Sequence, residues 1–342
     1  MVTIKEVASR AKVSVGTVSN VISGLVPVGP RLRDRVEKAI AELNYHPNYV
    51  ARGLRTKQTH MLGIVISDIT NPFFPLLVRG AEDAASKHGY LLTTFNTDDL
   101  PELERQVMGV LRSRRADGIL LVVAPSTGTD HIQGAIDAGI AVVCLDRVPK
   151  GIQVDAVTVN NLKGAEMCVR HLIQSGHTRI GIITGPLVLQ TARDRFRGYE
   201  NVLRENGLTL DRGLVREGNF RVDSGYRLGK DLCLSGARPS ALFVTNGMMG
   251  AGVVKALREL GVEYPRDMSL AVFDGLPWSD IFRPDVTSVV QPSYEMGFRG
   301  AELLIRRLQG KLPGRKVKAQ LELELKVGDS AASRVSERSA QP

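Results

Sequence analysis

The spacing of apolar residues predicts three short helices in the first 45 residues. The first would start at Thr3, which has the spacing of a capping box with Glu6, and the second would follow Ser14, a suitable N-cap. The third would begin at Pro30, because proline is tolerated at the first helical position. The apolar faces would consist of Ile4, Val7, Ala8 and Ala11, of Val18, Val21 and Ile22, and of Leu32, Val36, Ala39, Ile40 and Leu43.

From Leu62 the pattern changes to short apolar runs that alternate with amphipathic segments. The strand-like runs are LGIVIS, YLLTTF, DGILLVV, AVVCL, RIGIIT, ALFVT and SLAVF. Continuous apolar strands separated by helices indicate a parallel sheet that is covered on both faces. The number of repeats favours two doubly wound α/β lobes over one, behind an all-α N-terminal domain.

These patterns divide the chain into four parts. We expect a helix-turn-helix domain over residues 1–46, a hinge helix or linker over 47–60, and a two-lobe domain over 61–328. The tail 329–342, rich in Ser, Ala and charged residues, is expected to be disordered.

Charge separates the N-terminal part from the rest. Residues 1–60 hold ten Lys or Arg and four Asp or Glu, so they carry +6 of the net charge of +9. A basic module on a nearly neutral body is typical of nucleic-acid binding, although a solubilising surface would look the same. No run of about 18 apolar residues indicates a membrane span, and the first residues lack the apolar core of a signal peptide, so a cytoplasmic protein is expected.

The three cysteines have no metal or redox spacing. Cys144, Cys168 and Cys233 are scattered in apolar surroundings and are expected to be buried free thiols. We therefore expect no metal and no cofactor.

Helix, short turn and helix, with small and polar residues at the start of the second helix, indicate a helix-turn-helix that reads DNA. Asn20 could pair with an adenine edge, Val15 could meet a thymine methyl group, and Gly16 would permit close approach. A small three-helix packing module is the alternative. The candidate DNA-binding residues in this domain are Thr3, Ser14, Val15, Gly16, Thr17, Ser19 and Asn20.

The basic segment PNYVARGLRTKQ, which follows at Pro47, is too short to be a stable isolated helix and contains Gly53. Our hypothesis is a hinge that becomes helical only on DNA beside the same segment of a second subunit. Leu54 would be wedged between base steps, Arg55 would enter the minor groove, and Val50 with Ala51 would form the contact between the two hinges. A plain flexible linker is the alternative.

The segments TIKEVASRAKVSVGTVSNVISG and VEKAIAELNYHPNYVARGLRTKQTHMLGIVI resemble the LacI/GalR family of bacterial transcription regulators. The resemblance runs in order from Thr3 to about Leu325. It implies a repressor that binds a pseudo-palindromic operator in double-stranded DNA as a homodimer, in some members as a tetramer. It also implies a periplasmic-binding-protein-like body whose chain crosses between the lobes near residues 160, 290 and 320.

Ligands in open parallel sheets bind beyond the carboxyl ends of the strands, and several polar and aromatic residues of this chain follow predicted strands. Together such residues suit a polyhydroxylated ligand, and in the family these positions contact a small effector, often a sugar or a purine. Phe73 and Phe74 could instead be core aromatics. The candidate effector-binding residues are Asn71, Phe73, Phe74, Arg147, Thr191, Arg195, Phe220, Asn246 and Asp274.

Two positions depart from the family pattern. Gly247 replaces the Asp that commonly follows Asn246, and Asn160 stands where an Asp usually precedes Asn161. Two fewer carboxylates weaken the expectation of a neutral sugar and leave room for an anionic or otherwise different effector.

Two other functions fit parts of the sequence pattern. An enzyme is disfavoured because no metalloprotease, nucleophile-elbow or P-loop motif is present. A solute-binding protein would share the fold of the body but would have no use for residues 1–58.

Overall fold

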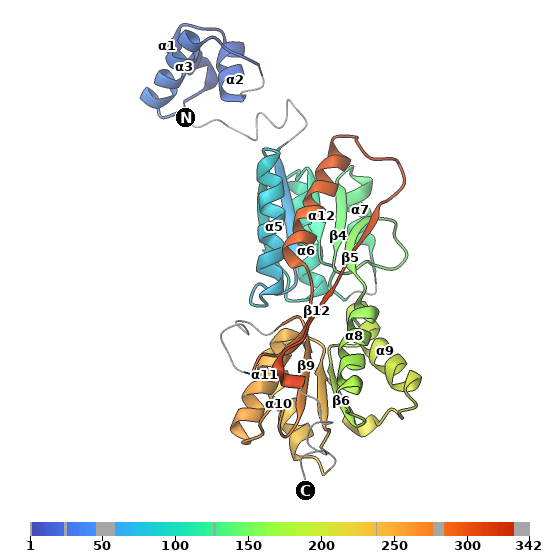
Figure 1. Cartoon of the computed structure of the whole chain (residues 1–342). Helices are drawn as coiled ribbons and strands as arrows, with labels where there is room; N and C mark the ends of the chain where they lie inside the picture. Colours follow the sequence, from blue (N-terminus) through green and yellow to red (C-terminus); the bar gives the residue numbers. More distant parts are fainter. Residues whose placement is uncertain are drawn as a thin grey trace. The chain divides into compact units, whose positions relative to one another are not determined.

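The structure is a computed structural model and describes residues 2–23, 26–45, 59–125, 128–236, 238–275 and 284–331 (Figure 1). The chain separates into two compact units, Met1–Thr59 and His60–Pro342. The hinge candidates Val50, Ala51, Leu54 and Arg55 lie outside the described residues.

The three predicted N-terminal helices are confirmed. They are α1 Ile4–Ala11, α2 Val15–Ser23 and α3 Pro30–Glu42, and the capping box of Thr3 and Glu6 forms with both of its hydrogen bonds. Leu32 does not join the core, because its side chain is 39% exposed in the first turn of α3. Tyr45, beyond the other end of α3, is buried in the core instead.

The second unit contains two six-stranded sheets, one in each lobe. The sheet of the N-terminal lobe is parallel throughout, in the order β11-β5-β4-β3-β1-β2. Its strands are β1 Met61–Ile66, β2 Leu91–Asn96, β3 Gly118–Leu121, β4 Ala141–Leu145, β5 Asp155–Val159 and β11 Lys318–Leu321. Its helices are α5 Phe73–Lys87, α6 Pro101–Ser113, α7 Asp130–Asp137 and α12 Ser293–Leu308.

The sheet of the C-terminal lobe has the order β12-β10-β9-β8-β6-β7, and only β12 is antiparallel to its neighbour. Its strands are β6 Ile180–Thr184, β7 Val215–Glu217, β8 Ala241–Val244, β9 Ser269–Phe273, β10 Thr287–Val290 and β12 Glu324–Lys326. Its helices are α8 Asn161–Gln174, α9 Gln190–Glu205, α10 Val222–Leu234 and α11 Gly247–Glu259, with the short 3-10 helices Arg212–Leu214 and Asp329–Ala331.

The chain crosses between the lobes three times, as predicted. The crossings follow β5, β10 and β11, because the next element in each case (α8, α12 and β12) belongs to the other lobe (Figure 1). Three chain segments therefore connect the same two lobes. Such connecting segments can act as hinges, so that the angle between the lobes can change.

Apolar clusters cover both faces of each sheet, as continuous apolar strands require. In the N-terminal lobe, α5 and α12 lie side by side on one face. Their close approach needs glycine: a Cβ on Gly80 would come within 1.9 Å of the Tyr294 carbonyl oxygen, and one on Gly297 within 1.8 Å of the Leu77 carbonyl oxygen.

Five short strands were not predicted from the sequence: β5, β7, β10, β11 and β12. β5 is the largest of them, and its Asp155 is only 1% exposed. The Asp155 carboxylate accepts hydrogen bonds from Arg307 at 2.8 and 2.7 Å and from the Val317 N–H at 2.7 Å. A buried carboxylate interrupts the apolar pattern of the strand. Its desolvation is offset by Arg307, which lies 152 residues away in the sequence.

Two expectations need correction. Residues 329–331 are ordered, because the buried Ser330 hydroxyl accepts from the Thr287 N–H at 2.8 Å and donates to the Leu270 carbonyl at 2.6 Å. Residues 332–342 lie outside the described part.

The second correction concerns the cysteines. Cys144 and Cys168 are buried free thiols as expected, whereas Cys233 is half-buried. In the described part of the chain, no helix is long and apolar enough to cross a membrane.

Candidate functional site

The start of α2 presents small and polar groups on the surface of the N-terminal unit. The Ser14 hydroxyl accepts from the Thr17 N–H at 3.1 Å and lies 2.9 Å from the Thr17 hydroxyl, so it caps the helix. Val15 is 41% exposed, and a Cβ on Gly16 would meet only the Ser14 hydroxyl, at 3.6 Å. Packing within the unit therefore does not require glycine at position 16. Close approach of a binding partner such as DNA would be a reason for glycine there.

The other DNA-binding candidates have mixed roles. Ser19 and Asn20 are half-buried on α2. Thr3 caps α1, and its backbone and side-chain hydrogen bonds lower the pKa of Glu6. Thr3 therefore stabilises the N-terminus of α1, independently of any contact with DNA.

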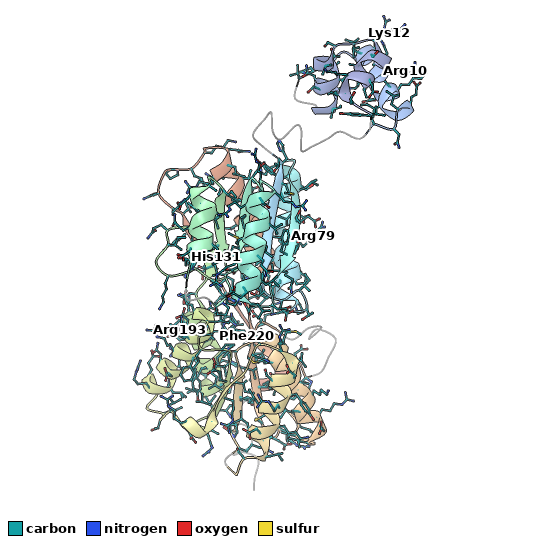
Figure 2. The ribbon with its side chains drawn as sticks, turned by 180° about the vertical axis from the view of Figure 1, so that it is seen from behind. Arg10, Lys12, Arg79, His131, Arg193 and Phe220 are labelled. Carbon is teal, nitrogen blue, oxygen red and sulfur yellow. The ribbon has the colours of Figure 1, made fainter. Side chains whose placement is uncertain are left out.

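Arg35 holds the turn between α1 and α2. Its guanidinium donates to the Ala11 carbonyl at 2.6 Å and to the Lys12 carbonyl at 2.9 Å. Lys12 has a left-handed backbone with φ of 51°, and Arg10 pairs with Glu42 at 2.5 Å (Figure 2). These interactions tie α3 to the C-terminal end of α1, directly before the turn that leads into α2.

All nine candidate effector-binding residues line one pocket between the two lobes. We call it the interlobe pocket. Its remaining lining residues, which the candidate set omitted, follow strand ends in the same way. The pocket is formed by the nine candidates together with Ser67, Asp68, Asp99, Asp146, Asn219, Arg221 and Gln291.

Arg195, on α9, organises the wall from the C-terminal lobe. It is 4% exposed, donates to the Asn161 side chain at 2.8 Å and to the Thr245 carbonyl at 2.7 Å, and lies 3.8 Å from the Asp274 carboxylate. Its guanidinium also stands 3.7 Å from the centroid of the Phe273 ring, a cation–π contact. This arrangement leaves Arg195 little freedom to move.

Arg147 has the corresponding place in the N-terminal lobe. It donates to the Asp99 carboxylate at 2.7 Å, to the Val123 carbonyl at 3.1 Å and to the Asp146 carboxylate at 3.3 Å. Burial, the largest single effect, lowers the pKa of Arg147, but Asp99 and Asp146 together raise it. The guanidinium therefore remains charged.

Asp146 and Asp274 are equivalent in the two lobes. Each directly follows a strand, has a positive φ (62° and 60°), and donates its N–H to a neighbouring strand. Burial raises the pKa of both carboxyls, and this effect is opposed by Arg147 and Arg195 at Asp146 and by Arg195 at Asp274. Burial also lowers the pKa of Arg195.

Three buried polar atoms of the interlobe pocket have no hydrogen-bond partner in the described part of the chain. They are Asp146 Oδ1, Gln291 Oε1 and Ser67 Oγ. Gln291 uses its amide N–H on Asp274 at 2.7 Å, so its oxygen remains available as an acceptor. An unsatisfied buried acceptor costs about 1–3 kcal/mol, so these atoms favour a ligand that donates hydrogen bonds.

Backbone strain is concentrated at the same place. Besides Asp146 and Asp274, positive φ occurs at Asp98 (51°), Asp99 (60°) and Phe220 (64°). Aspartate tolerates this conformation, but for a bulky Phe it is an outlier of the kind that clusters at binding sites. Phe220 lies where the two lobes meet (Figure 2). A Cβ on Gly185 would come within 2.1 Å of the Phe220 ring, so the ring packs directly against this glycine.

The aromatic and amide candidates combine two duties. Phe73 and Phe74 belong to the core of the N-terminal lobe and also line the pocket, with their rings 5.0 Å apart at an edge-to-face angle of 84°. Thr191 is buried in the first turn of α9. The Asn71 side chain accepts from the Phe73 N–H at 3.2 Å, and Asn246 caps α11 through the Met248 and Met249 N–H groups.

The departure at Gly247 has a structural explanation. A Cβ there would come within 2.4 Å of the Gly275 carbonyl oxygen and 2.5 Å of the Asp274 carbonyl oxygen. An aspartate at this position would therefore displace the loop that carries Asp274. Asn160 caps α8 by accepting from the Lys163 N–H, a task that Asp could also perform.

Arg221 joins the lobes at the edge of the pocket. From the C-terminal lobe it reaches Asp68 and Asp98 of the N-terminal lobe, each at 3.2 Å. The pocket has a volume of only about 40 Å³, room for a few water molecules. A ligand of ordinary metabolite size therefore needs the lobes or their side chains to move apart.

A DNA-reading helical unit joined to a two-lobe body with a polar interlobe pocket defines a class of protein: a ligand-responsive DNA-binding regulator. Residues 3–48 match the family of bacterial regulatory proteins of the lacI type, and residues 169–331 match the periplasmic binding protein-like domain.

The chain belongs to the LacI family of bacterial transcription regulators. It is 33% identical over 313 residues to the HTH-type transcriptional repressor PurR of Vibrio atlanticus, covering 91% of this chain and 93% of that protein. It is 34% identical over 311 residues to the ribose operon repressor of Halalkalibacterium halodurans, covering 91% and 92%. Among solved structures it resembles the lac repressor dimer bound to operator and the anti-inducer ONPF, with 25% identity, coverage of 97% and 99%, and a TM-score of 0.84.

Proposed function

We propose that two copies of this chain bind a pseudo-palindromic operator and repress transcription, under the control of a neutral, polyhydroxylated effector such as a sugar. The observation that carries the effector class is the pair of unpartnered buried acceptors, Asp146 Oδ1 and Gln291 Oε1, in the interlobe pocket. Two acceptors at fixed positions select a ligand with hydroxyl donors. The name of the ribose operon repressor agrees with this class.

The charge of the interlobe pocket favours a neutral ligand over an anion. Four carboxylates (Asp68, Asp99, Asp146 and Asp274) face three arginines there. The absence of an aspartate at positions 160 and 247 therefore does not make this pocket basic.

Allosteric control follows from where the effector would bind. A ligand between the lobes changes the equilibrium between their relative orientations, and the N-terminal lobe leads into residues 46–58 and the DNA-reading unit. In a dimer, that orientation would decide whether both α2 helices reach their half-sites. The hinge role of Val50, Ala51, Leu54 and Arg55 is part of this proposal. We propose no catalytic step, and the protein would act on DNA in the bacterial cytoplasm.

A thermal-shift screen of the full-length protein tests the effector class. Neutral sugars, sugar acids and nucleobases are added in turn, and a neutral sugar is expected to raise the unfolding temperature because ligand binding stabilises the folded state. The shift should disappear in Gln291→Leu and persist in Lys311→Glu, which changes an exposed residue of the N-terminal lobe. A response to nucleobases alone would contradict the proposed effector class.

The effector affinity is expected to fall on acidification. Ionised Asp146 and Asp274 accept hydrogen bonds better than their protonated forms, and burial raises the pKa of both above the ordinary value of 3.8. Affinity should be constant at higher pH and decrease as the pH falls through the raised pKa values. Calorimetric titrations from about pH 8 to about pH 4 would measure this.

Unfolding driven by Asp146 and Asp274 would not explain such a loss. A carboxyl whose pKa is raised on folding contributes stability that is present below its unfolded pKa and is lost as the pH rises through its folded pKa. Acidification thus favours folding through these two groups while it weakens binding. Asp146→Asn should bind weakly with a flatter pH profile, and an unchanged profile would exclude Asp146 as the titrating group.

A further inference from the structure

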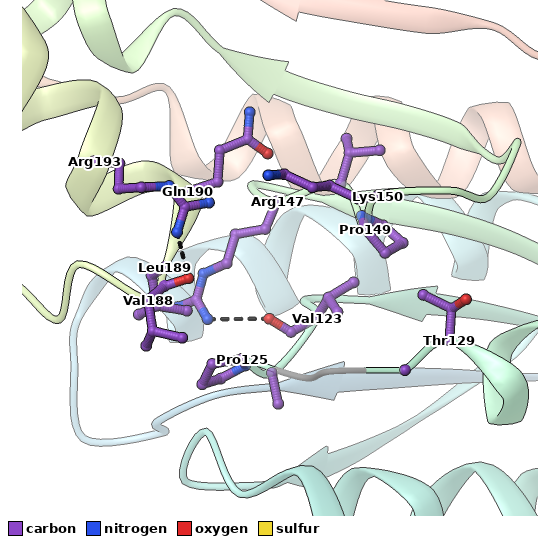
Figure 3. Close-up of a pocket in the computed structure, with 13 residues that line it drawn as sticks. Val123, Pro125, Thr129, Arg147, Pro149, Lys150, Val188, Leu189, Gln190 and Arg193 are labelled. Carbon is purple, nitrogen blue, oxygen red and sulfur yellow. Dashed lines mark hydrogen bonds between the residues drawn. The ribbon is translucent and has the colours of Figure 1, made fainter.

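A second and larger pocket lies beside the interlobe pocket and shares only Arg147 with it. We call it the basic pocket; its volume is about 380 Å³, within the range of small-molecule sites. Loops after β3 and β4 form one wall and the start of α9 forms the other, so both lobes contribute (Figure 3). It is lined by Val123, Ala124, Pro125, Gly128, Thr129, Arg147, Val148, Pro149, Lys150, Val188, Leu189, Gln190 and Arg193.

The charge of the basic pocket is opposite to that of the interlobe pocket. Its described lining residues include Arg147, Lys150 and Arg193 and no acidic residue. The charge of Arg147 is met by Asp99 and Asp146 outside the pocket. A net positive charge therefore remains with Lys150 and Arg193.

Neither Lys150 nor Arg193 forms an ion pair with any residue that the structure describes. Arg193 donates to the Leu187 carbonyl at 2.8 Å and the Val188 carbonyl at 2.6 Å, so its position is held while its charge is not neutralised. Lys150 is exposed and extends from the N-terminal lobe toward the start of α9 (Figure 3). One carboxylate lies close by, that of Asp194, which accepts from the Gln190 amide at 3.4 Å.

The start of α9 adds to the positive potential. This 16-residue helix has Leu189 at its N-cap, which supplies no side-chain hydrogen bond to the first turn. Leu189 and Gln190 line the basic pocket, so the positive end of the helix dipole lies at its wall. The backbone N–H groups of an uncapped first turn are suited to anions.

We propose that the basic pocket binds a small organic anion, a metabolite that carries a phosphate or carboxylate group, separately from the neutral effector. Lys150, Arg193 and the start of α9 would hold the anionic group, and Val148, Pro149 and Leu189 would contact the organic part. Because the two walls belong to different lobes, a bound anion stabilises the relative orientation in which they face each other. The protein would then respond to two ligands of different charge.

The test is calorimetric titration of the full-length protein at constant ionic strength with ribose 5-phosphate, gluconate, inorganic phosphate and ribose. We expect at least one organic anion to bind. Lys150→Glu should weaken that binding at least about tenfold, the loss of one charge-assisted hydrogen bond. Gln291→Leu, which disables the interlobe pocket, should leave it unchanged.

The matched control is Lys311→Glu, which removes the same charge from another exposed lysine of the N-terminal lobe. Lys150→Met serves as a second variant with no added negative charge, and unfolding temperatures check that each variant folds. The proposal is wrong if neither organic anion binds, if Lys311→Glu weakens binding as much as Lys150→Glu, or if Gln291→Leu abolishes anion binding. The last result would place the anion in the interlobe pocket.

Discussion

Deletion of residues 1–59 is expected to abolish operator binding and to leave effector binding unchanged. The chain separates into compact units between Thr59 and His60, and the small core around Val7, Val18 and Val36 shares no residue with the cores of the body. The candidate base-reading residues lie in the deleted unit. Operator DNA is first selected from a random pool with the full chain, and fluorescence anisotropy then measures both proteins.

Effector titration and thermal unfolding of the truncated body provide the control, since both should match those of the full chain. The expected loss of affinity is at least about a thousandfold, the usual ratio between specific and non-specific binding. Tight operator binding by the truncated body would contradict the division of work between the two units.

Substitution of Arg195 by Ala is expected to have the second-largest effect, on both stability and effector binding. It removes hydrogen bonds to Asn161 and to the Thr245 carbonyl and leaves the buried Asp274 without its cationic neighbour. Removing one partner of a buried ion pair typically costs about 3–5 kcal/mol of folding free energy. Denaturant unfolding would measure this loss, and effector affinity should fall at least about a hundredfold, the worth of one or two charged hydrogen bonds.

Arg170→Ala is the matched control. Arg170 pairs with Glu205 at 2.8 Å, but both side chains are about half exposed, so the loss should stay below about 1 kcal/mol. Arg195→Met separates the two effects, because it restores apolar volume without charge. If Arg195→Ala cost no more than Arg170→Ala, the arginine would not organise the interlobe pocket.

Strand-end residues could be predicted well from the sequence because parallel strands bring their carboxyl ends to one edge. Arg147, Phe220 and Asp274 were identified in this way and line one pocket with the other candidates. Gln291 was missed because its strand, TSVV, begins with two hydroxyl residues that are buried in the structure, and Thr287 donates its hydroxyl to the Gly328 carbonyl 41 residues away. Asp98 and Asp99 both follow β2, and only the fold places Asp99 within 2.7 Å of Arg147.

The basic pocket has no comparable signal. Lys150 and Arg193 are separated by more than forty residues, and neither follows a strand directly. Their shared environment exists only because two loops of one lobe face the first turn of α9 in the other. No local sequence pattern predicts that these two segments lie side by side.

The sequence by itself determined the helices, their caps, the alternation of strands and helices, and the family, because each depends on residues close together along the chain. Tertiary structure alone decided which charges are neutralised. It pairs Asp155 with Arg307 and leaves one acceptor oxygen each of Asp146 and Gln291 without a hydrogen bond from a described residue. It also places Lys150 and Arg193, which have no acidic partner among the described residues, in the same pocket. The physical reason is that electrostatic and hydrogen-bond energies depend on distance and burial in space, which the order of residues does not specify.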